Sequence, residues 1–499
     1  SIPKAKNQEY YPLVPSQHRI WVLSQLDEGS QAYIMSGAVL LKGELDIDKF
    51  KRAFDLLIDR HEILRTCFKI NEEGEVHQYI VDGHELNFDV VLFDFKDKSK
   101  QTIDQHLHQE QHNPFDLTKA PLLKASLLQT EEKVHLCSFV MHHIIGDGWS
   151  MELLMSEVIT TYNELLRNDK FESEKRSLQY KDYSVWLQSQ LKSESYQTSE
   201  RYWLDKFRGE LPVLDLPSFR QRPAIQTYNG KTVNHQFSKT FLSKLKQFSQ
   251  EHEVTLFMTL MTGVNALLYR YTNQSDIIIG TPIAGRDHPD LEDQIGLYLN
   301  TLAIRTQIGD GFSSEDLLQQ QKQTLLEAYE NQSYPFNELV SKLDISRDTS
   351  RSALFDVMVV LQNQSQLFSI KRDNDLEGIQ VEAYQIENTN SKFDISFTFA
   401  ETEGLELSIE YNTDIYHEFL IERMLVHYEN LMTHVIDNPK ASVSSIAYIT
   451  EEEKNQLLQE FNDTKVDFPK DKTIVDLFEE QVKKTPNNIA VVFNKQELT

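Results

Sequence analysis

The chain has 499 residues, of which 40% are hydrophobic, so it exceeds the size of a single core and we expect two or more domains. Its 50 basic and 77 acidic residues give a net charge of −27, which disfavours nucleic acid and anionic membranes as partners, because both repel an acidic surface. No apolar run approaches the length of a membrane span, and the opening residues SIPKAKNQEYYPL lack a signal-peptide core, so we expect a soluble cytoplasmic protein.

The first segment, to about Arg167, is predicted to mix strands and helices. AYIMSGAVLL (32–41) resembles a strand, and DIDKFKRAFDLLIDRHEIL (46–64) has helical periodicity. VHLCSFVM (134–141) is nearly all apolar, which predicts a strand buried on both faces. Ser150 is a plausible N-cap for the helix that follows, MELLMSEVITTYNELL. Cys67 and Cys137 both lie in apolar segments and are predicted to be buried thiols, which suits a reducing cytoplasm.

A polar interval without periodicity, residues 168–177, is predicted to connect this segment to a second α/β segment that runs to about Ala447. The second segment contains a strongly apolar helix, VTLFMTLMTGVNALLYRYT, and then a strand ending in a glycine-containing loop, DIIIGTPIAG. From Tyr448 a charged helix and a polar linker lead to the predicted helix IVDLFEEQVKKTP and the strand IAVVF. Because that strand lies so close to Thr499, we expect residues 448–499 to be the first piece of a further domain.

The stretch MHHIIGDGWS (141–150) places two imidazoles and a carboxylate in a short loop between the buried strand and the helix. Successive side chains of a strand face opposite sides, so one histidine can face a cleft while the other packs inward. Asp147 is close enough to brace the loop, although an aspartate paired with an arginine could be purely structural. Gly148 offers an unobstructed backbone N–H at a helix start, where developing negative charge is favoured. A neutral imidazole beside such a donor suits acyl transfer.

Other chemistries have less support in the sequence. A histidine next to a buried strand is more often a core residue than a catalyst, so one histidine alone would be weak evidence. No further His, Cys or Asp cluster has the spacing of metal ligands, and neither a G-x-S-x-G elbow nor a phosphate-binding glycine pattern occurs. We therefore expect no metal and no nucleotide to be required.

The segment 142–148 resembles the HHxxxDG motif of condensation domains of nonribosomal peptide synthetases. Six further stretches resemble the other motifs of that family in the same order: SQHRIWVL (16–23), RHEILRTCF (60–68), YKDYSVW (180–186), IGLYLNTLAIR (295–305), NQSYPFNE (331–338) and RDTSRSALF (347–355). The departures are Ser16 for alanine, Gly146 for a frequent serine, Ser333 for aspartate and Ser352-Ala353 for asparagine-proline. None of them affects His143 or Asp147.

The resemblance implies an α/β fold of two chloramphenicol-acetyltransferase-like lobes, residues 1–170 and 171–447, forming a V-shaped pseudo-dimer with a central tunnel. It implies amide bond formation between a donor acyl or peptidyl thioester and an acceptor aminoacyl thioester. Both substrates would arrive on phosphopantetheine arms of peptidyl carrier proteins, and no cofactor would be bound intrinsically.

The resemblance also assigns roles to residues. His143 is implied as the active-site histidine, with His142 as its structural neighbour, Asp147 as the partner of Arg286, and Gly148 as the oxyanion donor. Trp149, Ser150, Tyr298 and Asn300 are expected to line the substrate cleft, although strand alternation would send part of the segment at Tyr298 into the core. Arg65, in the second motif, is expected to be structural, as is Arg286.

Residues 448–499 resemble the linker and opening of an adenylation domain, which would be a neighbour in the same polypeptide. Two alternatives stay open. An epimerization domain shares the HHxxxDG loop but inverts an aminoacyl centre, and a non-catalytic docking module recruits other enzymes to a carrier. The adenylation-like tail disfavours the first alternative, and the intact His143 disfavours the second.

Overall fold

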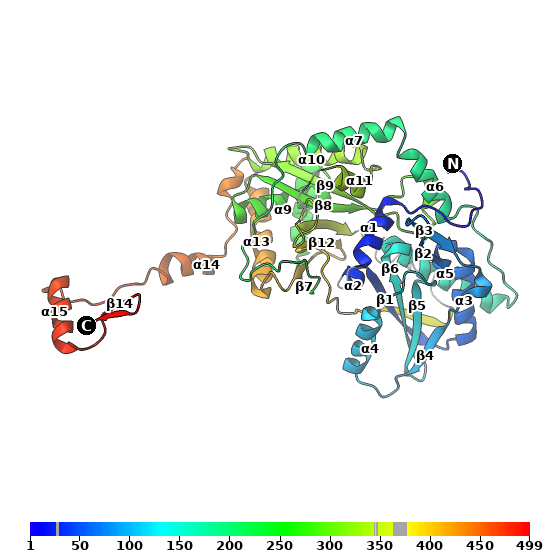
Figure 1. The fold of residues 1–499 in the computed structure, drawn as a ribbon, viewed down its shortest axis with the longest axis horizontal. Coiled ribbons are helices and arrows are strands. Elements are labelled where there is room, and N and C mark those ends of the chain that lie inside the picture. Colours follow the sequence, from blue (N-terminus) through cyan, green and yellow to red (C-terminus); the bar gives the residue numbers. More distant parts are fainter. Residues whose placement is uncertain (26–28, 344, 346–347, 363–376) are drawn as a thin grey trace. The chain divides into compact units, whose positions relative to one another are not determined.

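The computed structural model describes residues 1–25, 29–343, 345, 348–362 and 377–499, and the chain divides into two compact units, 1–448 and 449–499. The first residue of the seventh motif, Arg347, lies outside the described residues. The larger unit is built on two mixed sheets with helices packed around them (Figure 1). Each sheet with its helices forms one lobe of the chloramphenicol-acetyltransferase-like fold.

The first lobe is built on a five-stranded sheet in the order β11-β1-β6-β5-β4. Its strands are β1 (Ile34–Gly43), β4 (Val90–Asp94), β5 (Leu123–Glu131), β6 (Val134–His142) and β11 (Ile379–Ala383). All neighbours are antiparallel except β4 and β5. A separate hairpin joins β2 (Thr66–Ile70) to β3 (Val76–Ile80). Strand β6 is the strand predicted from VHLCSFVM, and every residue of it after Val134 is buried.

Helices and short turns surround the sheet of the first lobe. They are α1 (Pro15–Ser24), α2 (Gly29–Ala32), α3 (Ile47–Arg60), α4 (Lys100–His112) and α5 (Gly148–Arg167), with short 3-10 turns η1 (Glu62–Arg65), η2 (Gly83–Glu85) and η3 (His143–Ile145). Helices α3 and α5 pack side by side, and α4 packs against β1 and β6. The cap of α5 is Asp147 and not Ser150 as predicted, because the Asp147 carboxylate accepts the Ser150 N–H at 2.9 Å.

The second lobe is built on a six-stranded sheet in the order β7-β13-β12-β10-β8-β9. Its strands are β7 (Gly230–Phe237), β8 (Asp276–Ile283), β9 (Asn300–Gln307), β10 (Val357–Gln362), β12 (Ile395–Glu401) and β13 (Leu405–Asn412). Strand β10 runs parallel to β8 and β12, and the other pairs are antiparallel. The predicted apolar helix is α9, which packs against α8, α10 and α13.

The remaining elements of the larger unit are helices and short turns after the polar interval. They are α6 (Tyr180–Gln190), α7 (Glu194–Lys206), α8 (Lys239–Glu251), α9 (Leu256–Thr272), α10 (Ser314–Glu330), α11 (Phe336–Lys342), α13 (Glu418–Asp437), η4 (Pro289–Leu291) and η5 (Val443–Ser445). The polar interval 168–177 contains no helix or strand, as predicted.

One strand departs from a simple division of the chain into lobes at residue 170. Strand β11 belongs by sequence to the second predicted lobe, yet it pairs antiparallel with β1 at the edge of the first sheet, with Val39 opposite Ala383. The chain then returns to the second sheet at β12. A continuous range of residues therefore does not describe either lobe completely.

The smaller unit contains α14 (Glu451–Asn455), a π-helical turn η6 (Gln456–Glu460), α15 (Ile474–Lys484), and a hairpin of β14 (Val491–Phe493) and β15 (Gln496–Leu498). Its apolar side chains are largely exposed, among them Ile474 at 86% and Phe493 at 70%. The helix and strand predicted for this region are both present.

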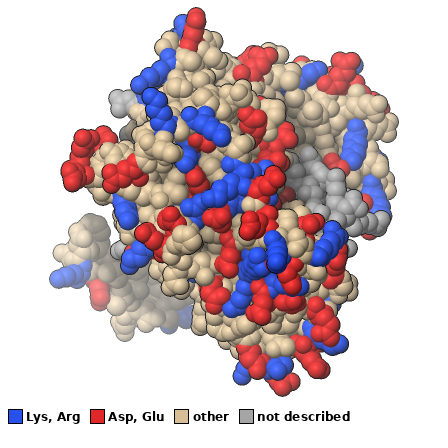
Figure 2. All heavy atoms as spheres, turned by 90° about the vertical axis from the view of Figure 1, so that its right-hand side faces the viewer, with Lys and Arg blue, Asp and Glu red and all other residues tan. Residues whose placement is uncertain are grey.

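Charge and apolar surface follow the sequence expectations. Both cysteines are free and buried, and no helix of the described residues is long and apolar enough to cross a membrane. Acidic and basic side chains are interspersed on the face of the molecule in Figure 2, with a group of basic side chains near its centre.

Candidate active site

The two adjacent histidines lie at the end of β6 and occupy different environments. His142 is the last residue of the strand and is fully buried, and its Nδ1 accepts a hydrogen bond from the N–H of Ile144 at 3.1 Å. Burial lowers the pKa of His142 to about 3. The ring packs edge-on against Phe115, with the centroids 6.2 Å apart. His142 is therefore a neutral residue of the core that fixes the turn after β6.

His143 begins the turn η3 and is only partly buried. Its backbone N–H donates to the carbonyl oxygen of Tyr33 at 2.7 Å, and the Tyr33 ring lies edge-on to the imidazole at 6.4 Å. Nδ1 is buried and has no hydrogen-bond partner among the described residues. Burial, and then the charge of Lys392, hold the pKa of His143 well below its usual range. The imidazole is therefore neutral at pH 7 and able to accept a proton.

Asp147 joins the histidine loop to the second lobe. Its carboxylate is 2% exposed; Oδ1 accepts from Ser150 Oγ at 2.8 Å and from Arg286 Nη2 at 3.0 Å. Oδ2 accepts from the N–H of Tyr298 at 3.0 Å and of Leu299 at 3.3 Å. A buried carboxylate with this many donors is fixed in position.

Arg286 is the partner that the sequence comparison suggested for Asp147. Its side chain is 3% exposed, and Nη1 donates to the carbonyl oxygens of Leu291 at 2.7 Å and Gln294 at 2.6 Å. The guanidinium carbon lies 4.3 Å from the ring centroid of Tyr298. Arg286 therefore closes its own loop and holds that loop against the histidine loop.

The residues after Gly148 serve this junction more than a substrate. Ser150 is fully buried, and its hydroxyl bonds to Asp147, Arg286 and both backbone groups of Gly296. Its prediction as a substrate-binding residue is wrong, because no surface of it can be reached. Trp149 donates its indole N–H to the carbonyl oxygen of Glu292 at 3.0 Å. Its ring is partly exposed, so its expected contact with substrate stays a prediction.

Tyr298 and Asn300 were also expected to line the cleft. Tyr298 is 4% exposed and packs between Tyr183 and Arg286, and burial is the main reason that its pKa lies well above the ordinary value. The side chain of Asn300 donates to the carbonyl oxygens of Gln332 and Tyr334, each at 2.9 Å, and accepts from the N–H of Phe336 at 3.0 Å. Tyr298 is a core residue, whereas Asn300 is partly buried and fixes the loop before α11, and its expected place in the cleft stays a prediction.

Two predicted residues have simpler surroundings. Arg65 is 8% exposed and donates to three backbone carbonyls, those of Ile58, Asp59 and Val81, which is a structural role. Gly148 is exposed as the first residue of α5, and the position that a Cβ would take has no atom within 4 Å. A backbone N–H at a helix start favours developing negative charge, so this exposed residue is a candidate oxyanion donor. No cluster of metal ligands occurs within the part of the chain that the structure describes.

Three side chains at the site carry no assignment from the sequence. Gln17 is fully buried in α1, and its Nε2 donates to the carbonyl oxygen of Ile144 at 3.1 Å, which supports the turn after β6. The position of Gln17 in the first motif was the one signal in the sequence that could have assigned it to the site. Tyr33 and Lys392 lie outside the seven motifs and approach His143 only through the fold.

These features define an acyltransferase-like site on a two-lobed fold, and comparison with known proteins identifies the family. The family model described as "Condensation domain" matches residues 7–458. The chain is 38% identical to bacitracin synthase 2 of Bacillus licheniformis over 500 residues and 39% identical to gramicidin S synthase 2 of Brevibacillus brevis over 503 residues. Each alignment covers 100% of this chain but only 18% and 11%, respectively, of the relative.

Solved structures show the same fold at low sequence identity. A four-domain nonribosomal peptide synthetase bound to AMP and glycine matches with a TM-score of 0.83 at 21% identity, over 97% of this chain and 38% of that one. The first condensation domain of the calcium-dependent antibiotic synthetase matches with a TM-score of 0.71 at 18% identity, over 89% of this chain and 100% of that one. The chain belongs to the condensation-domain family of nonribosomal peptide synthetases, whose members are acyltransferases that form amide bonds.

Proposed function

We propose that the chain forms an amide bond between a donor acyl or peptidyl thioester and an acceptor aminoacyl thioester. The acceptor amine attacks the donor thioester carbonyl, a C–N bond forms, and the C–S bond breaks. The nitrogen loses a proton and the departing thiolate of the donor arm gains one. The observation that carries this proposal is the neutral imidazole of His143, with an unpartnered Nδ1 among the described residues, on a loop locked by Asp147 and Arg286.

The roles of the residues follow from their surroundings. His143 positions the attacking amine by a hydrogen bond and accepts the proton of the zwitterionic intermediate. The backbone N–H of Gly148, an exposed residue at the start of α5, stabilises the oxyanion. His142 stays neutral inside the core and orients its neighbour. Thioesters are activated acyl groups, so holding both substrates together supplies much of the acceleration.

The partners belong to the same proposal. Both thioesters arrive on phosphopantetheine arms of peptidyl carrier proteins, one donor and one acceptor, and the arms carry substrate, so this chain contributes no cofactor of its own. An adenylation domain follows in the same polypeptide; the adenylation-like sequence of residues 448–499 and the small share of the relatives that the chain covers support this arrangement.

The requirement for two loaded carriers tests the proposed reaction. One carrier is loaded with a candidate donor, the other with a candidate acceptor amino acid, and the mass of each is followed. Amide product is expected on the acceptor carrier only when both are loaded. An epimerase would instead incorporate deuterium from solvent into a single loaded carrier without amide product, and a docking module would do neither.

A further inference from the structure

We propose that Lys392 is a positioning residue for His143: beyond the effect of burial, its ammonium group opposes protonation of the imidazole and so shifts the acid limit of the reaction to lower pH. The inference rests on the proposed function, in which His143 must accept a proton. It adds a residue from the second half of the chain that belongs to none of the seven motifs.

Lys392 reaches the site from the loop between β11 and β12. Its Nζ lies 5.5 Å from the ring centroid of Tyr33, and this ring stands edge-on to His143 with the centroids 6.4 Å apart. The carbonyl of Tyr33 also holds the backbone N–H of His143 at 2.7 Å. The same tyrosine therefore contacts the histidine through its backbone and ring and contacts the lysine through its ring.

The ammonium group makes no hydrogen bond and no salt bridge within the described residues, although Lys392 is partly buried. A partly buried lysine without an ion-pair partner is uncommon in proteins. The contact that its charge does make is with the ring of Tyr33, beside His143.

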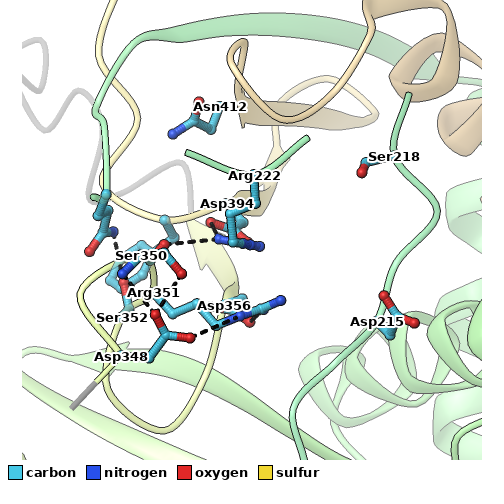
Figure 3. Close-up of polar contacts among 12 residues, drawn as sticks. Asp215, Ser218, Arg222, Asp348, Ser350, Arg351, Ser352, Asp356, Asp394 and Asn412 are labelled. Atoms are coloured by element: carbon cyan, nitrogen blue, oxygen red, sulfur yellow. Dashed lines mark hydrogen bonds and ion pairs between the residues drawn. The ribbon is translucent and has the colours of Figure 1, made fainter. Parts of the chain in front are cut away.

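Contacts of the Lys392 backbone and of the Asp394 side chain hold the loop that carries Lys392. The carboxylate of Asp394, two residues later, forms a salt bridge with Arg222, which also donates to the carbonyl oxygen of Ser350 at 3.0 Å (Figure 3). The carbonyl of Lys392 accepts from Gln226 Nε2 at 3.2 Å. These contacts fix the loop, so the position of the ammonium does not depend on bonds that the ammonium makes.

The charged and titratable groups around the pair come from several elements. His142 of β6 and Tyr33 adjoin His143, while Arg19 of α1 and Tyr228 act on Tyr33. Glu410 of β13 acts on Lys392 and is held by the side chain of Asn388 at 2.7 Å. No carboxylate of the described residues forms an ion pair with His143. A cation at this place therefore opposes a second positive charge on the imidazole.

The charge state of each group gives the sign of the effect. Burial lowers the pKa of Lys392 to about 8, so the ammonium stays charged through the acid range in which an imidazole is protonated. Lys392 in turn contributes, after burial, to the lowered pKa of His143. Removing the charge therefore raises the pKa of His143 and moves its protonation to higher pH.

The direct test follows the imidazole of His143 by NMR in protein labelled at histidine, with the His143→Ala spectrum used for assignment. In Lys392→Met the titration midpoint of His143 is expected at higher pH than in the parent, and Lys392→Arg is expected to restore the parent midpoint. Lys206→Met is a matched control, since its Nζ also lies over a tyrosine ring, 5.4 Å from the centroid, but on α7. An unchanged midpoint in Lys392→Met overturns the proposal, whatever happens to the activity.

The reaction provides the second readout. The ratio of parent to Lys392→Met rates, measured with the same loaded carriers, is expected to be larger at about pH 6 than at about pH 9 by about threefold or more. Since both proteins receive the same acceptor amine, its own protonation cancels in this ratio. A purely structural lysine would lower the rate equally at every pH, and that result also overturns the proposal. Failure of the proposed reaction itself is distinguishable, because the parent would then form no amide at any pH.

Discussion

The carboxylate of Asp147 accepts five hydrogen bonds, which come from Ser150, Arg286, Tyr298 and Leu299. Two of the five come from Ser150, three residues after Asp147, and three come from the second lobe. The residue adjacent to the chemistry is thus a joint between lobes, and the reactive imidazole is positioned by contacts that it does not itself make.

Replacing Asp147 with alanine is expected to lower the free energy of unfolding by about 3–5 kcal/mol, because the buried guanidinium of Arg286 loses its counter-charge. Amide formation is expected to fall as well, since the loop loses its anchor. Denaturant unfolding of the variant and the parent measures the first effect. Equal stability of the two proteins would contradict the pairing.

His142 is expected to make the fold sensitive to acid. Its pKa is about 3 in the folded protein and about 6.5 in an unfolded chain. Between these values the unfolded chain binds the extra proton, so the stability contributed by neutral His142 is complete above about pH 6.5 and is lost as the pH falls toward 3.

In His142→Asn, whose amide oxygen can still accept from the N–H of Ile144, the loss of stability between pH 7 and pH 4 is expected to be smaller than in the parent. Denaturant unfolding at both pH values measures this difference. The exposed His18→Asn is the control and is expected to follow the parent. A variant at position 142 with the parental pH dependence would show that protonation of His142 does not limit stability.

For individual residues, the sequence predicted which side chains the histidine loop contains better than it predicted what surrounds them. The predicted Asp147–Arg286 pair is present, although only Asp147 lies in one of the seven motifs. Ser150 and Tyr298 were wrongly expected at the substrate, because their burial comes from packing between lobes that lie far apart in sequence. Lys392 could not be predicted at all, since only the folded chain brings its loop to Tyr33.

The loop after β8 shows how one element places a side chain. Gly285, next to Arg286, has a φ of +67°, and a Cβ at this position would overlap the carbonyl oxygen of Tyr298. Only glycine combines that backbone conformation with so close an approach. The loop can therefore pack against residues 298–300 and direct Arg286 to Asp147.

Gly285→Ala is expected to lower the rate of amide formation by about tenfold or more, because the loop and Arg286 must move. Gly311→Ala is the matched control: it has a similar φ of +74°, but nothing lies within 4 Å of its Cβ position. The control carries the backbone strain without the collision and is expected to keep nearly the parental rate. Equal losses in the two variants would attribute the effect to strain alone.

Periodicity predicted several elements of the fold, among them β1, α3, β6, α9 and β8. It did not predict the partner of each strand, because alternation describes the faces of a strand and not its neighbours. Strand β11 illustrates this limit, since its sequence gives no sign that it leaves the second sheet to pair with β1.

Across the whole molecule, the same contacts that hold the lobes together also arrange the site. One core of buried residues includes Val140 and Ile144 of the first lobe together with Leu297 and Leu302 of the second. Ile144 and Ile145 anchor the histidine loop in this continuous core, and burial there lowers the pKa of both neighbouring imidazoles. The chain spans less than a fifth of the length of bacitracin synthase 2.

The most direct test of the account compares the parent with His143→Ala in a single turnover between two loaded carriers, with melting temperatures measured on the same samples. The account predicts that amide formation falls by about 10²-fold or more, because the proton acceptor is lost. The melting temperature is expected to stay close to that of the parent, since the imidazole is partly exposed and its Nδ1 has no partner among the described residues. A His143→Ala protein that melts like the parent and forms amide at the parental rate would contradict the central claim that His143 carries the reaction.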